Sequence, residues 1–225
     1  LIRSAGLKGK SVIARLRGAA LLPAGLLDAW QLLSRRRPHV VVGVGGYSSG
    51  PVVLLAALRG TATMVLEQNA VPGLTNRWLA PFVRAAAVTY DGTLSYFRGR
   101  GFVAGNPVRP EFLRGAGDAA GAARPPRVLT LGGSQGAHAI NVAMVAAAPE
   151  LVRRCPALEI VHQTGTRDHA WVRDQYAAAG IPARVVPFLD AVAGEMTTAD
   201  VVVSRAGATT LAELAALGRP AVLVP

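Results

Sequence analysis

A glycine-rich stretch in the middle of the chain combines residue types that can hold a phosphate. Residues 132–136 read GGSQG, between the apolar run 127–131 and an alanine-rich stretch from Ala137 that predicts a helix. Glycine permits a close backbone approach, the unpaired N–H groups at the start of a helix attract anions, and the Ser134 hydroxyl adds a donor. A tight strand-to-helix connection with Ser134 as helix N-cap would explain the same residues. The stretch alone therefore leaves both interpretations open.

Three polar residues follow a second apolar run. Glu67, Gln68 and Asn69 come directly after TATMVL. Functional polar groups gather at the carboxyl ends of parallel strands, whereas a plain turn needs only one asparagine or glycine. Glu67 is the candidate general base for an acceptor hydroxyl in the first half of the chain. The alternative, which we favour, is a structural carboxylate that accepts hydrogen bonds from backbone N–H groups.

A cation and a carboxylate in the second half can contact a nucleotide. Arg109 ends the stretch GNPVR, and Glu213 stands three residues after Thr210 in AGATTLAELAALG. The spacing T-x-x-E is that of a helix capping box. A carboxylate beside a glycine turn also suits the two hydroxyls of a ribose. Both roles for Glu213 stay open on the residues alone.

The histidines and the cysteine indicate structural roles. His162 ends the run LEIVH, where a buried structural histidine is the default, and His39, His138 and His169 give no metal-ligand spacing with it. We therefore expect no metal site. Cys155 is the single cysteine, so no internal disulfide can form, which fits a reducing compartment.

The elements that must position these residues alternate between strand and helix. Short β-branched runs, apolar on both faces, alternate with helical patterns, which predicts an α/β fold with doubly wound parallel sheets. The stretch 109–126 is rich in glycine, alanine and proline without an apolar period, and predicts a linker between two α/β halves. The glycine-bearing turns at 43–51, 131–136 and 204–210 would then lie at carboxyl ends of strands.

Charge is concentrated at the start of the chain. Of the net charge of +11 over 225 residues, the stretch 1–38 carries eight lysines and arginines against the single Asp28. Leucines and Trp30 are interspersed among these cations, a pattern that suits an anionic lipid surface better than nucleic acid. A solvated basic face over ordinary core leucines is the alternative. No apolar run is long enough to span a membrane. The chain starts without methionine and stops on the strand-like PAVLVP, so we expect a fragment.

Six motifs in order resemble one family. GVGGYSSGP, EQNAVPGLTN, GNPVR, LGGSQGAHAIN, VHQTG and DVVVSRAGATTLAELAALGRPAVLVP are similar to the corresponding motifs of the MurG family of bacterial glycosyltransferases. The resemblance implies a GT-B fold of two Rossmann-like domains facing across a cleft, both incomplete here. It places the acceptor and membrane-side domain in 1–108, the linker in 109–126 and the UDP-sugar-binding domain in 127–225.

The resemblance also implies an activity and its partners. The family moves N-acetylglucosamine from UDP-N-acetylglucosamine to lipid I, undecaprenyl-pyrophosphoryl-N-acetylmuramyl-pentapeptide, which makes lipid II for peptidoglycan. It acts as a peripheral protein at the cytoplasmic face of the bacterial cell membrane, binds no nucleic acid and uses no cofactor or metal. The positions that match its UDP-sugar contacts are Asn69, Arg109, Ser134, Leu189, Ala208, Thr209, Thr210, Leu211, Ala212 and Glu213.

The chain also departs from the family pattern. Leu66 stands where the family motif has a histidine, and a leucine cannot transfer protons. The family's first glycine-rich loop and its sugar-recognising segment fall outside residues 1–225, so we expect the chain to bind uridine but to transfer sugar poorly. Two other functions stay open: another GT-B UDP-sugar transferase or epimerase, and a non-catalytic basic module that binds membrane or nucleic acid.

Overall fold

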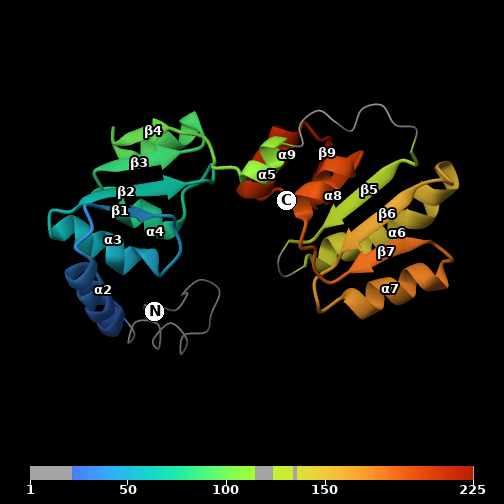
Figure 1. The fold of residues 1–225 in the computed structure, drawn as a ribbon, viewed down its shortest axis with the longest axis horizontal. Coiled ribbons are helices and arrows are strands. Elements are labelled where there is room, and N and C mark those ends of the chain that lie inside the picture. The colour runs from blue at the N-terminus through green and yellow to red at the C-terminus, as the bar shows by residue number, and fades with distance from the viewer. Residues whose placement is uncertain (1–21, 115–123, 134–135, 225) are drawn as a thin grey trace. The chain divides into compact units, whose positions relative to one another are not determined.

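The computed structural model describes residues 22–114, 124–133 and 136–224 (Figure 1). The chain divides into two compact units, Leu1–Asn106 and Pro107–Pro225. Each unit is built around its own parallel sheet, as the alternation of strand and helix predicts. The two α/β units with parallel sheets that the sequence predicts are therefore present.

The first unit holds a four-stranded sheet in the order β1-β2-β3-β4, with all neighbours parallel. Its strands are β1 (Val40–Gly43), β2 (Ala62–Glu67), β3 (Ala85–Val88) and β4 (Gly101–Val103). Its helices are α2 (Leu22–Arg36), α3 (Ser49–Leu58), α4 (Leu74–Leu79) and the 3-10 helix Asp91–Phe97. The core lies between α3, α4 and the sheet, where Val53, Val65 and Phe97 are fully buried.

The second unit holds a five-stranded sheet in the order β7-β6-β5-β8-β9, again all parallel. Its strands are β5 (Arg127–Leu131), β6 (Glu159–Gln163), β7 (Ala183–Val186), β8 (Val201–Arg205) and β9 (Ala221–Val224). Its helices are α5 (Pro110–Arg114), α6 (His138–Arg154), α7 (His169–Ala178), α8 (Val192–Thr198) and α9 (Ala208–Leu217). The chain runs from β5 outward to β7 and then returns to β8 beside β5. The order of strands therefore reverses between β5 and β8, which is where doubly wound sheets bind ligands.

Part of the stretch that the sequence predicts as a linker belongs to the second unit. Helix α5 lies inside 109–126, and Phe112 on it is fully buried in the main core of that unit with Leu129 and Met196. Helix α5 contacts both α8 and α9. One phenylalanine in a short helix produces no apolar period, which is why the pattern of this stretch resembles a linker.

None of the helices among the described residues is both long enough and apolar enough to cross a membrane. The longest, α6, has 17 residues and ends on Arg153 and Arg154.

Candidate functional site

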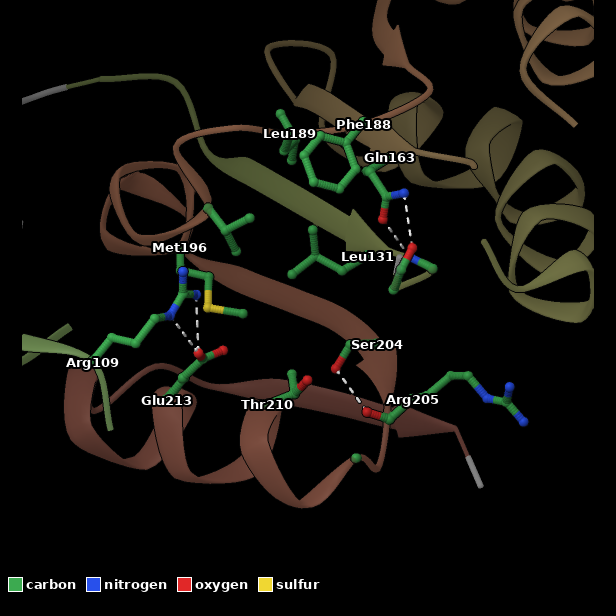
Figure 2. A pocket seen from close by; sticks show the side chains of 14 residues that line it. Arg109, Leu131, Gln163, Phe188, Leu189, Met196, Ser204, Arg205, Thr210 and Glu213 are labelled. Carbon is green, nitrogen blue, oxygen red and sulfur yellow. Dashed lines mark hydrogen bonds and ion pairs between the residues drawn. The ribbon is translucent and has the colours of Figure 1, made fainter. Parts of the chain in front are cut away.

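A pocket of about 340 Å³ lies at the carboxyl edge of the second sheet, at the reversal point between β5 and β8 (Figure 2). Its walls come from the ends of β5, β6 and β8, from the loop after β7, and from helices α8 and α9. Arg109, which immediately precedes α5, completes it. The pocket is lined by Arg109, Leu131, Gly132, Gly133, Gln163, Phe188, Leu189, Val192, Met196, Ser204, Arg205, Gly207, Thr210 and Glu213.

The glycine turn forms one wall of this pocket, and close packing requires glycine there. A Cβ on Gly132 would stand 2.7 Å from the backbone nitrogen of Ala137. Gly136 has φ of +78°, and a Cβ there would stand 2.2 Å from the carbonyl oxygen of Thr164. Helix α6 has Ala137 at its N-cap, so the N-cap alternative for Ser134 does not describe this helix start. Ser134 itself lies outside the described residues.

Gln163, the last residue of β6, forms hydrogen bonds to both this turn and the loop after β7. Its side-chain oxygen accepts a hydrogen bond from the Gly132 N–H at 3.1 Å. Its amide nitrogen donates to the carbonyls of Gly133, at 3.0 Å, and Pro187, at 3.1 Å. Gln163 is 4% exposed, so these three bonds form almost entirely away from water. Figure 2 shows two of them.

The opposite wall carries an ion pair between the predicted cation and carboxylate. Oε1 of Glu213 accepts hydrogen bonds from Nη2 of Arg109 at 3.0 Å and from Nε at 3.3 Å (Figure 2). The Glu213 side chain is 8% exposed and that of Arg109 is 55% exposed. The guanidinium also lies 4.7 Å from the centroid of the Phe112 ring, within the distance of about 6 Å at which a cation–π contact forms. A buried carboxylate is thus held by a cation that stays accessible to solvent.

The capping-box interpretation of Glu213 is wrong. Helix α9 begins at Ala208 with Gly207 as its N-cap, so Thr210 already lies in the first turn. Gly207 has no side chain that could cap, and Glu213 bonds Arg109 instead. The carboxylate therefore faces the pocket and not the helix start.

The remaining wall is apolar. Phe188 and Leu189 follow β7, and Val192 and Met196 lie on α8. Phe188 is 59% exposed, whereas Leu189 and Met196 belong to the buried core. A flat, partly exposed ring beside a rigid apolar floor offers a surface on which a planar base can lie.

A buried polar network supports the back of the glycine turn. His162 is fully buried, with Nε2 at 3.0 Å from the Asn141 side-chain oxygen and Nδ1 at 2.9 Å from the Tyr176 hydroxyl. Because the asparagine oxygen only accepts, Nε2 carries the proton and Nδ1 accepts from Tyr176. Burial lowers the pKa of His162 to about 4 and raises that of Tyr176 to about 12. His162 is therefore the neutral structural histidine that the sequence predicts.

The network reaches the start of α6 through Asp168. Asn141 donates to a carboxylate oxygen of Asp168 at 2.9 Å and to the backbone oxygen of Thr164 at 3.0 Å. The same Asp168 oxygen lies 2.9 Å from Nδ1 of His138, and this hydrogen bond lowers the pKa of Asp168. The network thereby links Thr164, which follows β6, to the first turns of α6.

The first unit has a second polar pocket at the carboxyl edge of its own sheet. It is lined by Val44, Gly45, Gly46, Tyr47, Glu67, Gln68, Asn69, Val71, Pro72, Gly73, Leu74, Thr75, Asn76 and Arg77. Glu67 ends β2 and is 2% exposed. One carboxylate oxygen accepts from the backbone and side-chain nitrogens of Asn69 at 3.0 and 2.9 Å. The other accepts from Gly73 N and Asn76 Nδ2, both at 2.9 Å. These contacts agree with the interpretation that the sequence favours for Glu67, a structural carboxylate and not a general base.

Some of the residues predicted to contact the UDP-sugar line one pocket, and others do not. Arg109, Leu189, Thr210 and Glu213 line one pocket of the second unit. Asn69 is exposed at the pocket of the first unit. The other predicted residues of the second unit that the structure describes lie on α9 without lining its pocket: Ala208, Thr209, Leu211 and Ala212.

Sequence reasoning missed Gln163 and Phe188. Gln163 follows His162 in the motif VHQTG, and Phe188 immediately precedes the predicted contact Leu189. The signal for Gln163 was present, because a polar residue that ends a strand predicts a group at the ligand-binding edge. Among the described residues, no group of three or more histidine, cysteine, aspartate or glutamate side chains could hold a metal ion.

Comparison with known proteins assigns a family to each unit. Residues 1–88 match the glycosyltransferase family 28 N-terminal domain, and residues 127–225 match its C-terminal domain. The UDP-N-acetylglucosamine--N-acetylmuramyl-(pentapeptide) pyrophosphoryl-undecaprenol N-acetylglucosamine transferase of Anaeromyxobacter sp. (strain K) is 44% identical over 100% of this chain and 59% of its own length. That of Pelobacter propionicus is also 44% identical, with 65% of its length covered. The chain thus spans about three fifths of the length of such relatives.

Solved structures agree with this assignment. The crystal structure of Acinetobacter baumannii MurG is similar with a TM-score of 0.72 and 30% identity, over 100% of this chain and 63% of that one. A UDP-GlcNAc 2-epimerase from Neisseria meningitidis shares the fold with a TM-score of 0.66, over 96% of this chain and 66% of that one, but only 11% identity. With both of its domains matched and its fold shared with MurG, the chain belongs to glycosyltransferase family 28.

Proposed function

We propose that this chain is the larger part of an enzyme that transfers N-acetylglucosamine from UDP-N-acetylglucosamine to lipid I and so forms lipid II. Residues 1–108 serve the acceptor and the membrane, and residues 127–225 bind the UDP-sugar. The observation that carries the proposal is the pocket that joins the glycine turn, the apolar wall and the Arg109–Glu213 pair at the reversal point of the second sheet. The 44% identity to transferases of this name over the whole chain supports it.

The pocket matches the three parts of a uridine diphosphate. The uracil lies against Phe188 and the backbone of Leu189, the ribose hydroxyls meet the carboxylate of Glu213, and the diphosphate lies on residues 132–136 at the start of α6. Helix α6 has 17 residues, so its N-terminus presents unpaired N–H groups and the positive end of a helix dipole. Thr210 and the first turn of α9 add a second helix start beside Arg205. Asn69, at the pocket of the first unit, is a further proposed contact of the UDP-sugar.

In the reaction, the acceptor hydroxyl oxygen attacks the anomeric carbon of the sugar while the bond from that carbon to the diphosphate breaks. Negative charge grows on the diphosphate, and the glycine turn and helix starts stabilise it there. The acceptor hydroxyl gives up its proton to solvent water as the new bond forms, and UDP leaves with the bonding electrons. No metal or cofactor takes part in this scheme.

Glu67 is placed to organise the acceptor side rather than to take that proton. Each of its oxygens already accepts two hydrogen bonds. A general base needs a lone pair directed at the proton that it removes. We therefore assign Glu67 the positioning of Asn69 and of the loop to Asn76.

Binding is tested by calorimetric titration of the chain with UDP-N-acetylglucosamine, UDP and GDP. We expect the two uridine nucleotides to bind and GDP to bind at least tenfold more weakly, because the apolar wall and the Glu213 carboxylate define a site for one base and its ribose. Equal affinity for all three, or no binding of UDP, would contradict the proposal. Transfer to a lipid I analogue is then measured with a chain extended to the length of its relatives.

The same proposal places the first unit on an anionic membrane at the cytoplasmic face. Helix α2 exposes Leu27 and Trp30, at 55% and 51%, and its last turn carries Arg35 and Arg36, followed by Arg37. Exposed apolar side chains next to cations are typical of helices that lie in a lipid interface, where each cation contributes about 1 kcal/mol.

Replacement of Arg35, Arg36 and Arg37 by glutamine should lower binding to anionic vesicles by at least tenfold and leave UDP binding unchanged. Vesicle sedimentation measures the first and calorimetry the second. The matched control removes three exposed arginines from the second unit, Arg153, Arg154 and Arg173. Equal losses in both variants would indicate a general charge effect, and salt-sensitive binding to duplex DNA would favour a nucleic-acid partner instead.

A further inference from the structure

Gln163 is the one side chain among the described residues that hydrogen-bonds both the glycine turn and the loop leading to Phe188. These two segments are far apart in sequence, because the turn follows β5 and the loop follows β7. Strand β6 lies between β5 and β7 in the sheet, and Gln163 is its last residue. The amide therefore spans the sheet edge from one ligand-contacting segment to the other.

The bonding pattern allows only one orientation of the amide and only one residue type. The oxygen faces a donor, the N–H of Gly132, and the two N–H bonds face two acceptors, the carbonyls of Gly133 and Pro187. A reversed amide would oppose like groups at all three contacts. Glutamate has the same shape but no donor at neutral pH, and methionine has a similar length without hydrogen bonding.

On the basis of the proposed function, we propose that Gln163 is a positioning residue that sets the spacing between the diphosphate site and the base site. It touches neither the base nor the phosphates by this assignment. It fixes the turn and the loop at the separation that one UDP molecule requires, so that both ends of the nucleotide bind at once. A ligand that bridges two fixed subsites gains affinity because the second contact needs no further ordering of the protein.

Replacement of Gln163 should therefore lower the affinity for a ligand by an amount that depends on whether the ligand spans one subsite or both. Uridine contacts only the base loop and Glu213, and its affinity should respond little to the position of the glycine turn. UDP spans both subsites. Gln163→Met should therefore raise the Kd of UDP by about tenfold, which corresponds to roughly 1.4 kcal/mol, and that of uridine by less than threefold. Gln163→Glu should raise the UDP Kd further, because a carboxylate would oppose the carbonyls of Gly133 and Pro187.

The experiment measures the Kd of uridine and of UDP by calorimetry for the 225-residue chain and for each variant. The matched control is Thr164→Val, which removes a buried hydroxyl that lies 2.9 Å from the carbonyl oxygen of Gly165 and 3.3 Å from that of Val186, beside Gln163 but outside the pocket lining. Hydrogen exchange of peptides that contain Gly132 and Phe188 gives a readout without ligand. Exchange should speed up in both peptides in the Gln163 variants. In the control it should speed up only in the peptide that contains Val186 and Phe188.

The outcomes separate this inference from the function on which it rests. A wild-type chain that does not bind UDP contradicts the proposed function, and the role of Gln163 with it. Binding of UDP by the wild type, with an unchanged ratio of the uridine and UDP Kd values in Gln163→Met and Gln163→Glu, contradicts the positioning role alone. If one of the two variants does not fold, the ratio measured for the other decides. The same change of ratio in Thr164→Val would also overturn the proposal, because it would reveal a general effect of the strand end.

Discussion

The two buried glutamates at the pockets of the two units differ in what holds them. Glu67 is 2% exposed and accepts four hydrogen bonds, all from residues within nine positions of it in sequence. Glu213 is 6% exposed and is held through one oxygen by Arg109, which stands 104 positions away and is largely open to solvent. A carboxylate surrounded by fixed local donors shapes a loop. A carboxylate held by one exposed cation can exchange that partner for a ligand.

The comparison predicts that loss of Glu67 damages the fold. Glu67→Ala removes the acceptor of four hydrogen bonds, one of them from the buried side chain of Asn76, and should lower the free energy of unfolding of the first unit by about 2–3 kcal/mol. Hydrogen exchange of peptides from residues 62–79 measures this unit separately. Glu67→Gln keeps one acceptor oxygen and should lose less. Unchanged exchange in Glu67→Ala would mean that the four bonds add nothing to stability.

His162 resembles Glu67 and not Glu213, because it is a buried titratable residue whose hydrogen-bond partners are uncharged groups of its own unit. Burial lowers its pKa to about 4 in the folded chain, whereas an unfolded histidine titrates near 6.5. The unfolded state therefore binds the proton first as the pH falls. The free energy of unfolding should be unaffected above about pH 7.5, fall by about 2 kcal/mol between pH 7 and pH 5, and fall further toward pH 4.

Denaturant unfolding of the second unit at several pH values measures this effect. A His162→Gln variant provides the control, because it has no ionisable ring and its pH dependence over this window should be flatter by the same amount. Equal pH dependence in both proteins would show that His162 is not the group that titrates.

Loss of Glu213 should affect ligand binding more than the fold. Glu213→Ala removes the acceptor proposed for the ribose and should weaken UDP binding by about 1.5 kcal/mol, roughly tenfold. Its effect on stability should stay within about 1 kcal/mol, because the exposed Arg109 can be hydrated in its absence. Calorimetry with UDP measures the first and thermal unfolding the second.

Arg109→Gln is the companion variant for this comparison. It should weaken UDP binding less than Glu213→Ala if the carboxylate contacts the ribose directly. An unchanged UDP affinity in a folded Glu213→Ala protein would contradict that contact. A loss of stability as large as in Glu67→Ala would place Glu213 among the structural carboxylates.

The sequence predicts the fold well where a pattern extends over a whole element. Alternating apolar runs and alanine-rich helices identify the two parallel sheets, since inner strands such as β3 and β5 are buried or half-buried on both faces and periodicity reports burial. The pattern fails at Phe112, where a single side chain in a five-residue helix joins a core. It also fails at Glu213, where the spacing from Thr210 fits a cap that the actual helix start at Ala208 excludes.

The site is predictable from the sequence only where its residues stand in local motifs. Arg109, Leu189, Thr210 and Glu213 stand in motifs that the family resemblance identifies, and the structure lines one pocket with them. The partner of Glu213 and the three bonds of Gln163 join segments distant in sequence. No local pattern reports such contacts, because they depend on the order of strands in the sheet.

The three glycines of the turn after β5 differ in the sequence variation that they tolerate. At Gly132 and Gly136 a side chain of any kind would overlap backbone atoms of the same turn or of the neighbouring strand end. At Gly133 the space is open and only the φ of +78° is restrictive, a conformation that asparagine and aspartate adopt with the least cost. In natural or engineered variants of this chain, the first and last glycines should therefore be invariant, while the middle one admits asparagine without loss of the turn.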